Sequence, residues 1–94
     1  MSRLRLRLYV AGDTQNSLRA RANLSAICRD RIAGPSQIEV VDILKEPMRA
    51  LADGVLMTPT LVRLGSPARH IVGTLSCTEV VLQALGLDDA LDHR

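Results

Sequence analysis

The architecture of this protein follows from one stretch near its start, Leu4-Arg5-Leu6-Arg7-Leu8-Tyr9-Val10-Ala11. Leucine and arginine alternate along it with the two-residue period of a strand that buries one face. We therefore expect a strand over residues 4–11, and we expect Arg3, Arg5 and Arg7 to be mainly solvated surface. The alternative is that these arginines form an electropositive contact for an acidic partner.

A turn and then a helix are predicted to follow this strand. The turn is Gly12-Asp13-Thr14-Gln15-Asn16, in which Thr14 and Asn16 are candidate N-cap residues. From Ser17 to Ile32 apolar side chains recur at helical spacing, and Gly34-Pro35 supplies a stop. These features predict a long helix with one apolar face.

The remainder of the chain is predicted to hold a strand, a short helix, a hairpin and a closing helix. The segments are a strand over 38–43, a helix over 48–52 after Pro47, strands over 60–64 and 69–73, and a helix that begins at the Ser76–Glu79 capping box. A turn is the alternative for the short helix. Residues 88–94 read as a polar tail of a single domain that covers residues 1–94.

The resulting order, β-α-β-(α)-β-β-α, is that of the α/β sandwich called thioredoxin-like. A β-α-β unit requires parallel neighbours and a right-handed crossover, and a hairpin with a closing helix completes the sandwich. The segment Met57-Thr58-Pro59-Thr60 supports this fold, because thioredoxin-like proteins carry a proline just before the third strand, usually in cis. We therefore expect the bond before Pro59 to be cis.

Composition excludes several classes of function. The 94 residues include 12 Lys and Arg and 10 Asp and Glu, so the net charge of +2 lacks the surplus expected of a nucleic-acid-binding domain. A single Tyr, with no Trp or Phe, leaves no platform for stacking bases. No apolar run could span a bilayer or act as a signal peptide. We expect a cytoplasmic protein that binds neither nucleic acid nor membrane.

The sequence also lacks a catalytic or metal-binding constellation. Thioredoxin-like redox chemistry needs a cysteine of low pKa at the start of the first helix, and residues 11–17 contain none. Cys28 is expected to be structural and Cys77 to be an inert thiol at the start of the last helix. His70 and His93 are too isolated for a zinc site or a dyad. We expect no enzyme activity, cofactor or metal, and a thiol oxidoreductase is the least favoured function.

Motifs distributed along the chain resemble those of the KaiB family. They are Leu8-Tyr9-Val10-Ala11-Gly12, Thr14, Asn16-Ser17, Arg19-Ala20, Val40, Asp42, Leu44-Lys45, Pro47, Thr58-Pro59-Thr60-Leu61, Ile71, Gly73, Leu75-Ser76 and Glu79. The resemblance runs from about Leu4 to Leu87. Its most distinctive part is the combination of residues 8–20 with residues 58–61.

The resemblance implies a non-enzymatic clock regulator that binds the ATPase ring of KaiC, competes there with a sensor histidine kinase and helps to sequester KaiA. It also implies a protein that switches folds. The family has a tetrameric ground state in which the second half of the chain is arranged uniquely, and a monomeric thioredoxin-like state that binds KaiC. Two alternatives stay open, a detached kinase sensor domain and a KaiB homologue that serves a stress response.

The resemblance further implies which residues contact the partner. The second strand and the first helix contribute to the KaiC contact in the family, and Gln37 and Glu39 match its contact positions on the strand. Glu39 stands where cyanobacterial clock relatives usually carry Lys, which reverses a charge at the contact. Tyr9, the only aromatic residue, is predicted on the outward face beside Arg7, either as an interface anchor or as a simple surface residue.

Two positions in or near the last helix affect which of the two folds is more populated at equilibrium. Ala84 stands where switching relatives commonly have Gly, and Ala is favoured over Gly inside a helix by about 0.8 to 1 kcal/mol. Gly86 stands where they commonly have Asp, and glycine suits the end of a helix. We therefore expect a mainly monomeric thioredoxin-like protein, with a tetramer belonging to the alternative fold.

Overall fold

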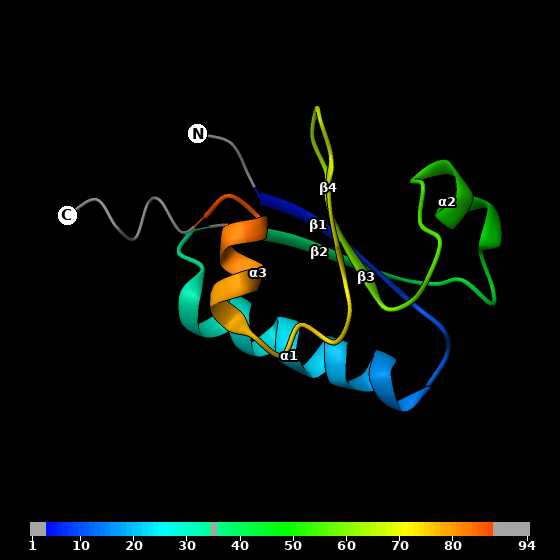
Figure 1. Ribbon diagram of the computed structural model, residues 1–94, viewed down its shortest axis with the longest axis horizontal. Helices are drawn as coiled ribbons and strands as arrows, with labels where there is room; N and C mark the ends of the chain where they lie inside the picture. Colours follow the sequence, from blue (N-terminus) through cyan, green and yellow to red (C-terminus); the bar gives the residue numbers. More distant parts are fainter. Residues whose placement is uncertain (1–3, 35, 88–94) are drawn as a thin grey trace.

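A computed structural model describes residues 4–34 and 36–87, which form one sheet with helices on both of its faces (Figure 1). The elements are β1 (Leu4–Val10), α1 (Gln15–Arg31), β2 (Ser36–Asp42), α2 (Pro47–Ala52), β3 (Thr60–Arg63), β4 (Arg69–Val72) and α3 (Thr78–Ala84). This order confirms the predicted thioredoxin-like fold, including the short helix. The predicted polar tail, Arg3 and His93 lie outside the described residues.

The sheet has the strand order β2-β1-β3-β4. β1 runs parallel to β2, with Leu8 opposite Val40, and antiparallel to β3, with Leu8 opposite Leu61. β3 and β4 form the predicted antiparallel hairpin, in which Leu61 pairs with Ile71. β1 and β3 are therefore the inner strands, and β2 and β4 are the two edges of the described sheet.

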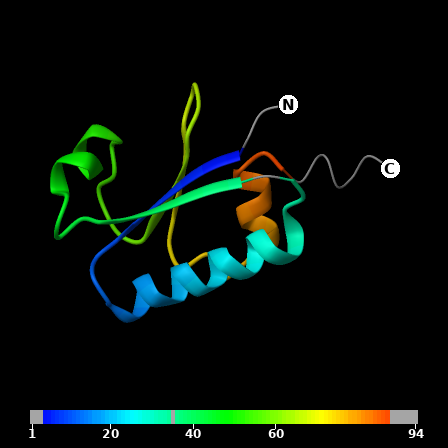
Figure 2. The same cartoon turned by 180° about the vertical axis from the view of Figure 1, so that it is seen from behind.

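The larger core lies between the sheet and the helices α1 and α3 (Figures 1 and 2). The alternating leucines of β1 supply its sheet side. Its buried members are Leu4, Leu6, Leu8, Val10, Ala20, Leu24, Ile27, Leu61, Leu75, Val81, Leu82 and Leu85. Cys28 is half-buried against this core, as predicted for a structural cysteine, and burial raises the pKa of its thiol.

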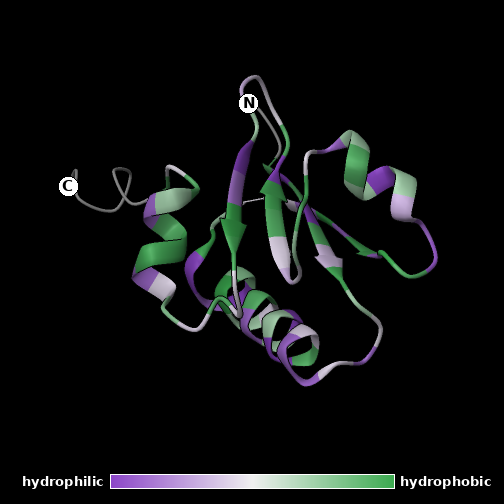
Figure 3. Ribbon diagram, turned by 45° about the vertical axis from the view of Figure 1, so that its right-hand side comes forward, coloured by the Kyte–Doolittle hydropathy of each residue, from purple (hydrophilic) through white to green (hydrophobic). Residues whose placement is uncertain are grey.

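A second, smaller core lies on the opposite face of the sheet, beneath α2. Its buried members are Tyr9, Val41, Ala50, Val55 and Val62. Figure 3 shows apolar residues on the strands and helices that meet in the two cores. The prediction that Tyr9 lies at the surface is wrong, because α2 covers the end of the strand face that carries it and leaves the residue 0% exposed.

The first residues of α1 and α3 differ from the predicted ones by one or two positions. Thr14 is the N-cap of α1, and its hydroxyl donates to the Ser17 hydroxyl oxygen at 2.8 Å. α3 begins at Thr78 with Cys77 as its N-cap, so the predicted Ser76–Glu79 capping box does not form. The Glu79 carboxylate pairs with Arg31 of α1 at 2.7 Å.

The end of α3 has the hydrogen-bond pattern of a Schellman motif. The Gly86 N–H donates to the Gln83 carbonyl at 3.0 Å, and the Leu87 N–H donates to the Leu82 carbonyl at 2.8 Å. Gly86 has φ of +78°, the left-handed conformation that this motif requires and that glycine adopts without strain. Gly86 thus ends the helix as predicted, whereas Ala84, predicted inside the helix, is its last residue.

Two arginines of the hairpin bind the same end of α3. The Arg63 guanidinium donates to the Leu85 carbonyl, and the Arg69 guanidinium donates to the Ala84 carbonyl at 3.4 Å. Positive charge is favourable at this position because the last carbonyls of a helix carry its negative partial charge. The hairpin therefore stabilises the helix that follows it.

The turn before β3 confirms one sequence prediction, and the turn after β2 is held by a carboxylate. The Thr58–Pro59 bond is cis. The Asp42 carboxylate accepts hydrogen bonds from the backbone N–H groups of Gly12 at 3.1 Å and Leu44 at 2.9 Å, so it caps a turn. No helix in residues 4–34 or 36–87 is long and apolar enough to cross a membrane.

The Schellman motif predicts the effect of adding a methyl group at Gly86. A Cβ there would lie 3.3 Å from Arg69 Cζ, whereas a Cβ at Gly54, which has φ of +70°, would meet nothing within 4 Å. We expect Gly54→Ala to lose about 1 kcal/mol of unfolding free energy from its φ alone. Gly86→Ala should lose more, because it also displaces Arg69. Urea unfolding followed by circular dichroism checks this, and equal losses would mean that Arg69 does not stabilise α3.

Candidate functional site

The candidate site is the exposed edge strand β2 and the groove beside it. Residues Ser36 to Val40 of this strand are all exposed. Gln37 pairs in register with Arg5, and Glu39 pairs with Arg7, so these four side chains share the face of the sheet on which α2 lies. They line a groove of about 280 Å³. The structure therefore brings together the two predicted contact residues and two arginines of β1.

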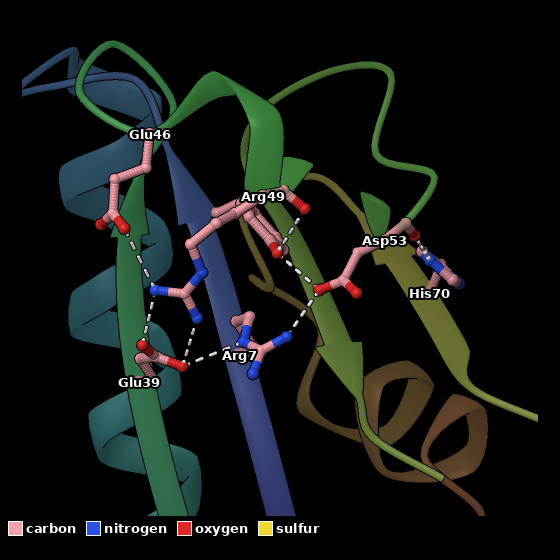
Figure 4. Close-up of polar contacts among 7 residues, drawn as sticks. Arg7, Glu39, Glu46, Arg49, Asp53 and His70 are labelled. Carbon is pink, nitrogen blue, oxygen red and sulfur yellow. Dashed lines mark hydrogen bonds and ion pairs between the residues drawn. The ribbon is translucent and has the colours of Figure 1, made fainter. Parts of the chain in front are cut away.

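Glu39 is held from two sides by arginines (Figure 4). Arg49 of α2 contacts both carboxylate oxygens, with Nη2–Oε1 and Nη1–Oε2 distances of 2.8 Å each. Arg7 donates from Nε to Glu39 Oε1 at 3.0 Å. These charged hydrogen bonds, above all those from Arg49, lower the pKa of Glu39 from its ordinary value of 4.5 to about 2. Glu39 is therefore ionised at any physiological pH.

Asp53, at the end of α2, joins the same cluster from the inner side. Its Oδ2 accepts a hydrogen bond from the Tyr9 hydroxyl at 2.5 Å and one from Arg7 Nη1 at 2.8 Å. The Tyr9 hydroxyl also lies 3.0 Å from the Arg49 carbonyl oxygen. The bonds from Tyr9 and then Arg7 lower the pKa of Asp53, and burial followed by the bond to Asp53 raises the pKa of Tyr9.

We call the charged side chains Arg7, Glu39, Glu46, Arg49 and Asp53 the α2 clamp. Glu46 is its outermost member, with Oε1 at 3.4 Å from Arg49 Nη1. His70 of β4 adds a contact from the other side, since its Nε2 lies 2.7 Å from the Asp53 carbonyl oxygen. The clamp joins α2 to β1 and β2. Tyr9 is thus buried beneath α2 and holds that helix through its hydroxyl.

The predicted solvated arginine face is only partly correct. Arg5 is exposed, as predicted. Arg7 is not a free surface residue, because its side chain is only 20% exposed and is paired with both Glu39 and Asp53. The prediction that Arg7 is solvated was wrong, because α2 brings Asp53 over β1. No local pattern around Arg7 or Tyr9 signals a partner that lies more than forty positions away in the sequence.

The chemistry of the site is that of a binding surface. It presents the Gln37 amide, a fixed carboxylate and the half-exposed apolar side chains of Ile38 and Val40 along one open strand. In residues 4–34 and 36–87, no three His, Cys, Asp or Glu side chains are placed to hold a metal ion. Cys77 is exposed at the N-cap of α3, as predicted. Sequence analysis missed Arg49 and Asp53, which build the site from α2.

Comparison with known families and sequences gives a consistent result. The family model described as KaiB domain matches residues 7–87. The circadian clock protein KaiB3 of Synechocystis sp. is 40% identical over 89 residues, which cover 94% of this chain and 85% of that protein. The circadian clock oscillator protein KaiB of Rippkaea orientalis is 48% identical over 84 residues, which cover 88% of this chain and 79% of that protein.

A solved structure supports the fold independently of sequence identity. The N-terminal domain of Synechococcus elongatus SasA, determined in solution, superposes with a TM-score of 0.64. The match covers 96% of this chain and 87% of that one, at 18% sequence identity. At this identity the likeness concerns the thioredoxin-like fold alone.

The α2 clamp predicts that Arg7 and Arg5 differ in their contribution to stability. We expect Arg7→Met to lose about 1 to 2 kcal/mol of unfolding free energy, because Asp53 then keeps only one of its two partners. The matched control Arg5→Met should stay within about 0.5 kcal/mol of the parent protein. Chemical denaturation near neutral pH measures both.

The difference in unfolding free energy between Arg7→Met and Arg5→Met should also depend on pH. Because the folded protein lowers the pKa of Asp53 below 3.8, its contribution is complete above that pH and is lost as the pH falls further. The difference between Arg7→Met and Arg5→Met should therefore shrink in acid. A difference that stays constant down to acidic pH would contradict the pairing of Arg7 with Asp53.

Proposed function

The chain belongs to the KaiB family of circadian clock proteins, and on that premise we propose that it acts by binding rather than by catalysis. It docks on the ATPase ring of a KaiC-type partner, competes there with a sensor histidine kinase and takes part in sequestering KaiA. Gln37 and Glu39 of β2 contribute to the contact, and no cofactor or metal is required. The interaction takes place in the cytoplasm.

The observation that carries this proposal is the exposed groove along β2. Gln37 and Glu39 project into it beside Arg5, and the strand edge is open over five consecutive residues. Polar and charged groups that are accessible and fixed in place give a contact its register and its rate of association. The α2 clamp holds Glu39 in place, because Arg49 and Arg7 orient its carboxylate in the free protein.

The charge of the α2 clamp predicts which charge the partner surface should carry. The clamp combines two arginines with three carboxylates, so its formal charge is −1. The resemblance to KaiB puts Lys in place of Glu39 in the usual cyanobacterial clock proteins. A ring that faces this chain should therefore present cationic or hydrogen-bond-donating groups opposite Glu39. That expectation points to a KaiC from the same organism rather than a standard clock KaiC.

We also propose that the thioredoxin-like fold is the resting state of this chain. Three features of the described structure support it, namely Ala84 within α3, Gly86 in the Schellman motif and the two hairpin arginines on the last carbonyls. Each favours the helical form of residues 78–84. Since about 1.4 kcal/mol changes a population tenfold, even modest contributions of this kind shift the balance toward the thioredoxin-like monomer.

The alternatives from other functional classes have weaker support. A detached kinase sensor domain is compatible with the likeness to the SasA domain, but that likeness rests on 18% identity against 40% and 48% for KaiB relatives. A stress-response homologue would use the same surface with a different ring. A redox enzyme would depend on Cys77, so a Cys77→Ser protein that keeps all activity would remove that alternative.

A charge swap at the clamp tests the contact at β2. Glu39→Lys reverses the contact charge and also places Lys beside two arginines, whereas Glu39→Lys with Arg49→Glu restores an internal ion pair of opposite polarity. We expect the double variant to regain stability. Both variants should bind the KaiC-type ring of the same genome about fivefold more weakly, a change that corresponds to about 1 kcal/mol. Calorimetry or surface plasmon resonance during ATP hydrolysis measures the affinity.

The pair of variants separates a contact from a structural effect. If affinity recovers with stability in the double variant, Glu39 acts only through the fold. Unchanged affinity of both variants at low salt removes Glu39 from the interface. An increase in affinity for a cyanobacterial-type KaiC supports a contact in which this chain differs from its clock relatives.

The resting state is tested on the free protein. We expect light scattering to give a monomer and backbone chemical shifts to give helix over residues 78–84. Ala84→Gly combined with Gly86→Asp should raise the population of the other fold, by about tenfold if the left-handed residue of the C-cap contributes about 1.4 kcal/mol, because Gly86 has φ of +78° and Ala84 is the last residue of the helix. A free tetramer whose residues 78–84 are not helical contradicts the proposal.

A further inference from the structure

Within the part of the chain that the structure describes, the second edge of the sheet, β4, is open, and it makes none of the partner contacts proposed above. The Gly73 N–H donates to the Pro59 carbonyl at 2.9 Å, and Leu61 pairs with Ile71 in the same antiparallel ladder. Backbone groups alternate along such a ladder, so Ile71 turns its N–H and C=O toward β3. His70 and Val72 turn theirs away from the sheet. Each of these two residues thus presents one donor and one acceptor at the edge.

An apolar groove lies directly beside this edge. It has a volume of about 230 Å³ and is lined by Gly54, Val55, Leu56, Met57, Thr60, His70 and Val72. Leu56 is 91% exposed, and Met57 and Val72 are exposed by more than half. Exposed apolar side chains that gather in one groove are costly in water, and Met adapts its shape to varied partners. The groove is on the same face of the sheet as the side chains of His70 and Val72.

The other face of β4 carries positive charge. Arg69 and Arg63 lie there, against the last carbonyls of α3. Within residues 4–34 and 36–87, no carboxylate pairs with either guanidinium at 4.0 Å or less. An acidic side chain brought to this end of β4 would face Arg69 directly, with Arg63 one strand further in.

We propose that β4 is a docking edge for an extended, acidic segment of a partner protein, which adds to the sheet as an antiparallel fifth strand. The backbone groups of His70 and Val72 give the segment its hydrogen bonds, as in other cases of strand addition. Its residues opposite Val72 and His70 project into the groove and are apolar. The next residue, opposite Arg69, lies on the other face and is acidic.

The recognised sequence is therefore apolar-x-apolar-acidic, read along the incoming strand. A second copy of this chain does not meet this pattern. In the symmetric pairing centred on Ile71, β4 would present His70 opposite Val72, and Gly73 opposite Arg69. Such a dimer leaves both arginines without a carboxylate, so the charges favour a different, acidic partner over self-association.

Fluorescence anisotropy with a labelled synthetic peptide tests the proposal on the full chain. The probe contains Val-Thr-Val-Glu between Gly-Ser flanks. N-methylation of either Val amide removes a hydrogen bond to β4 and should weaken binding about tenfold. N-methylation of the Thr amide, which faces away from β4, should leave affinity unchanged. These two modifications leave the protein itself untouched, so a folding defect cannot explain the difference.

Two protein variants test the groove and the charge. Leu56→Ser should weaken binding several-fold, whereas Leu44→Ser, an exposed residue outside the groove, should not. Changing Glu to Gln in the peptide should weaken binding to the parent protein but not to Arg69→Gln. Equal binding of the Val- and Thr-methylated peptides overturns the proposal. So does a concentration-dependent dimer that the peptide dissociates, since it assigns β4 to a second copy.

This inference does not depend on the proposed function. β4 and β2 are opposite edges of the sheet, so the peptide should bind without displacing a partner from the β2 groove. Failure of the peptide experiments would leave the KaiC proposal intact, and failure of the KaiC experiments would leave the β4 proposal intact.

Discussion

The Asp53 carboxylate is the group on which the arrangement of one whole face of the sheet depends. It lies where α2 ends, and it accepts hydrogen bonds from Tyr9 and Arg7, two residues of the central strand. A six-residue helix has too few internal hydrogen bonds to persist by itself, so α2 needs contacts outside itself. Asp53 and the buried ring of Tyr9 provide them. With α2 in place, Arg49 reaches β2 and fixes Glu39, which in turn defines the groove beside β1.

The same dependence explains which parts of the structure could be predicted from sequence. The alternation of Leu4 to Val10, the spacing of apolar residues in α1 and the segment around Pro59 are local signals, and each led to the correct element. Gly86 was also placed correctly, because a glycine that follows a helix has a local conformational reason to be there. Fold class and element order therefore required no knowledge of long-range contacts.

The candidate site was less accessible to sequence reasoning because long-range contacts build it. Gln37 and Glu39 were located through a family resemblance, and their exposure agrees with a surface role. Nothing near Tyr9 or Arg7 indicated that a short helix some forty residues later would cover them. The Ser76 capping box failed because the helix begins one residue later than the motif requires, with Cys77 as its N-cap, and the Glu79 carboxylate pairs with Arg31.

The two arginines on the last carbonyls of α3 have a consequence for the way in which the second half of the chain can open. Arg63 and Arg69 belong to the hairpin, yet their guanidinium groups stabilise a helix that follows it in sequence. The helix therefore cannot unwind without releasing both strands' side chains, and the hairpin cannot detach without uncapping the helix. These contacts link the stability of the hairpin to that of the helix, so we expect the two to open together as one unit in hydrogen exchange. A chain that changes its fold in this region would do so in a single concerted step rather than one element at a time.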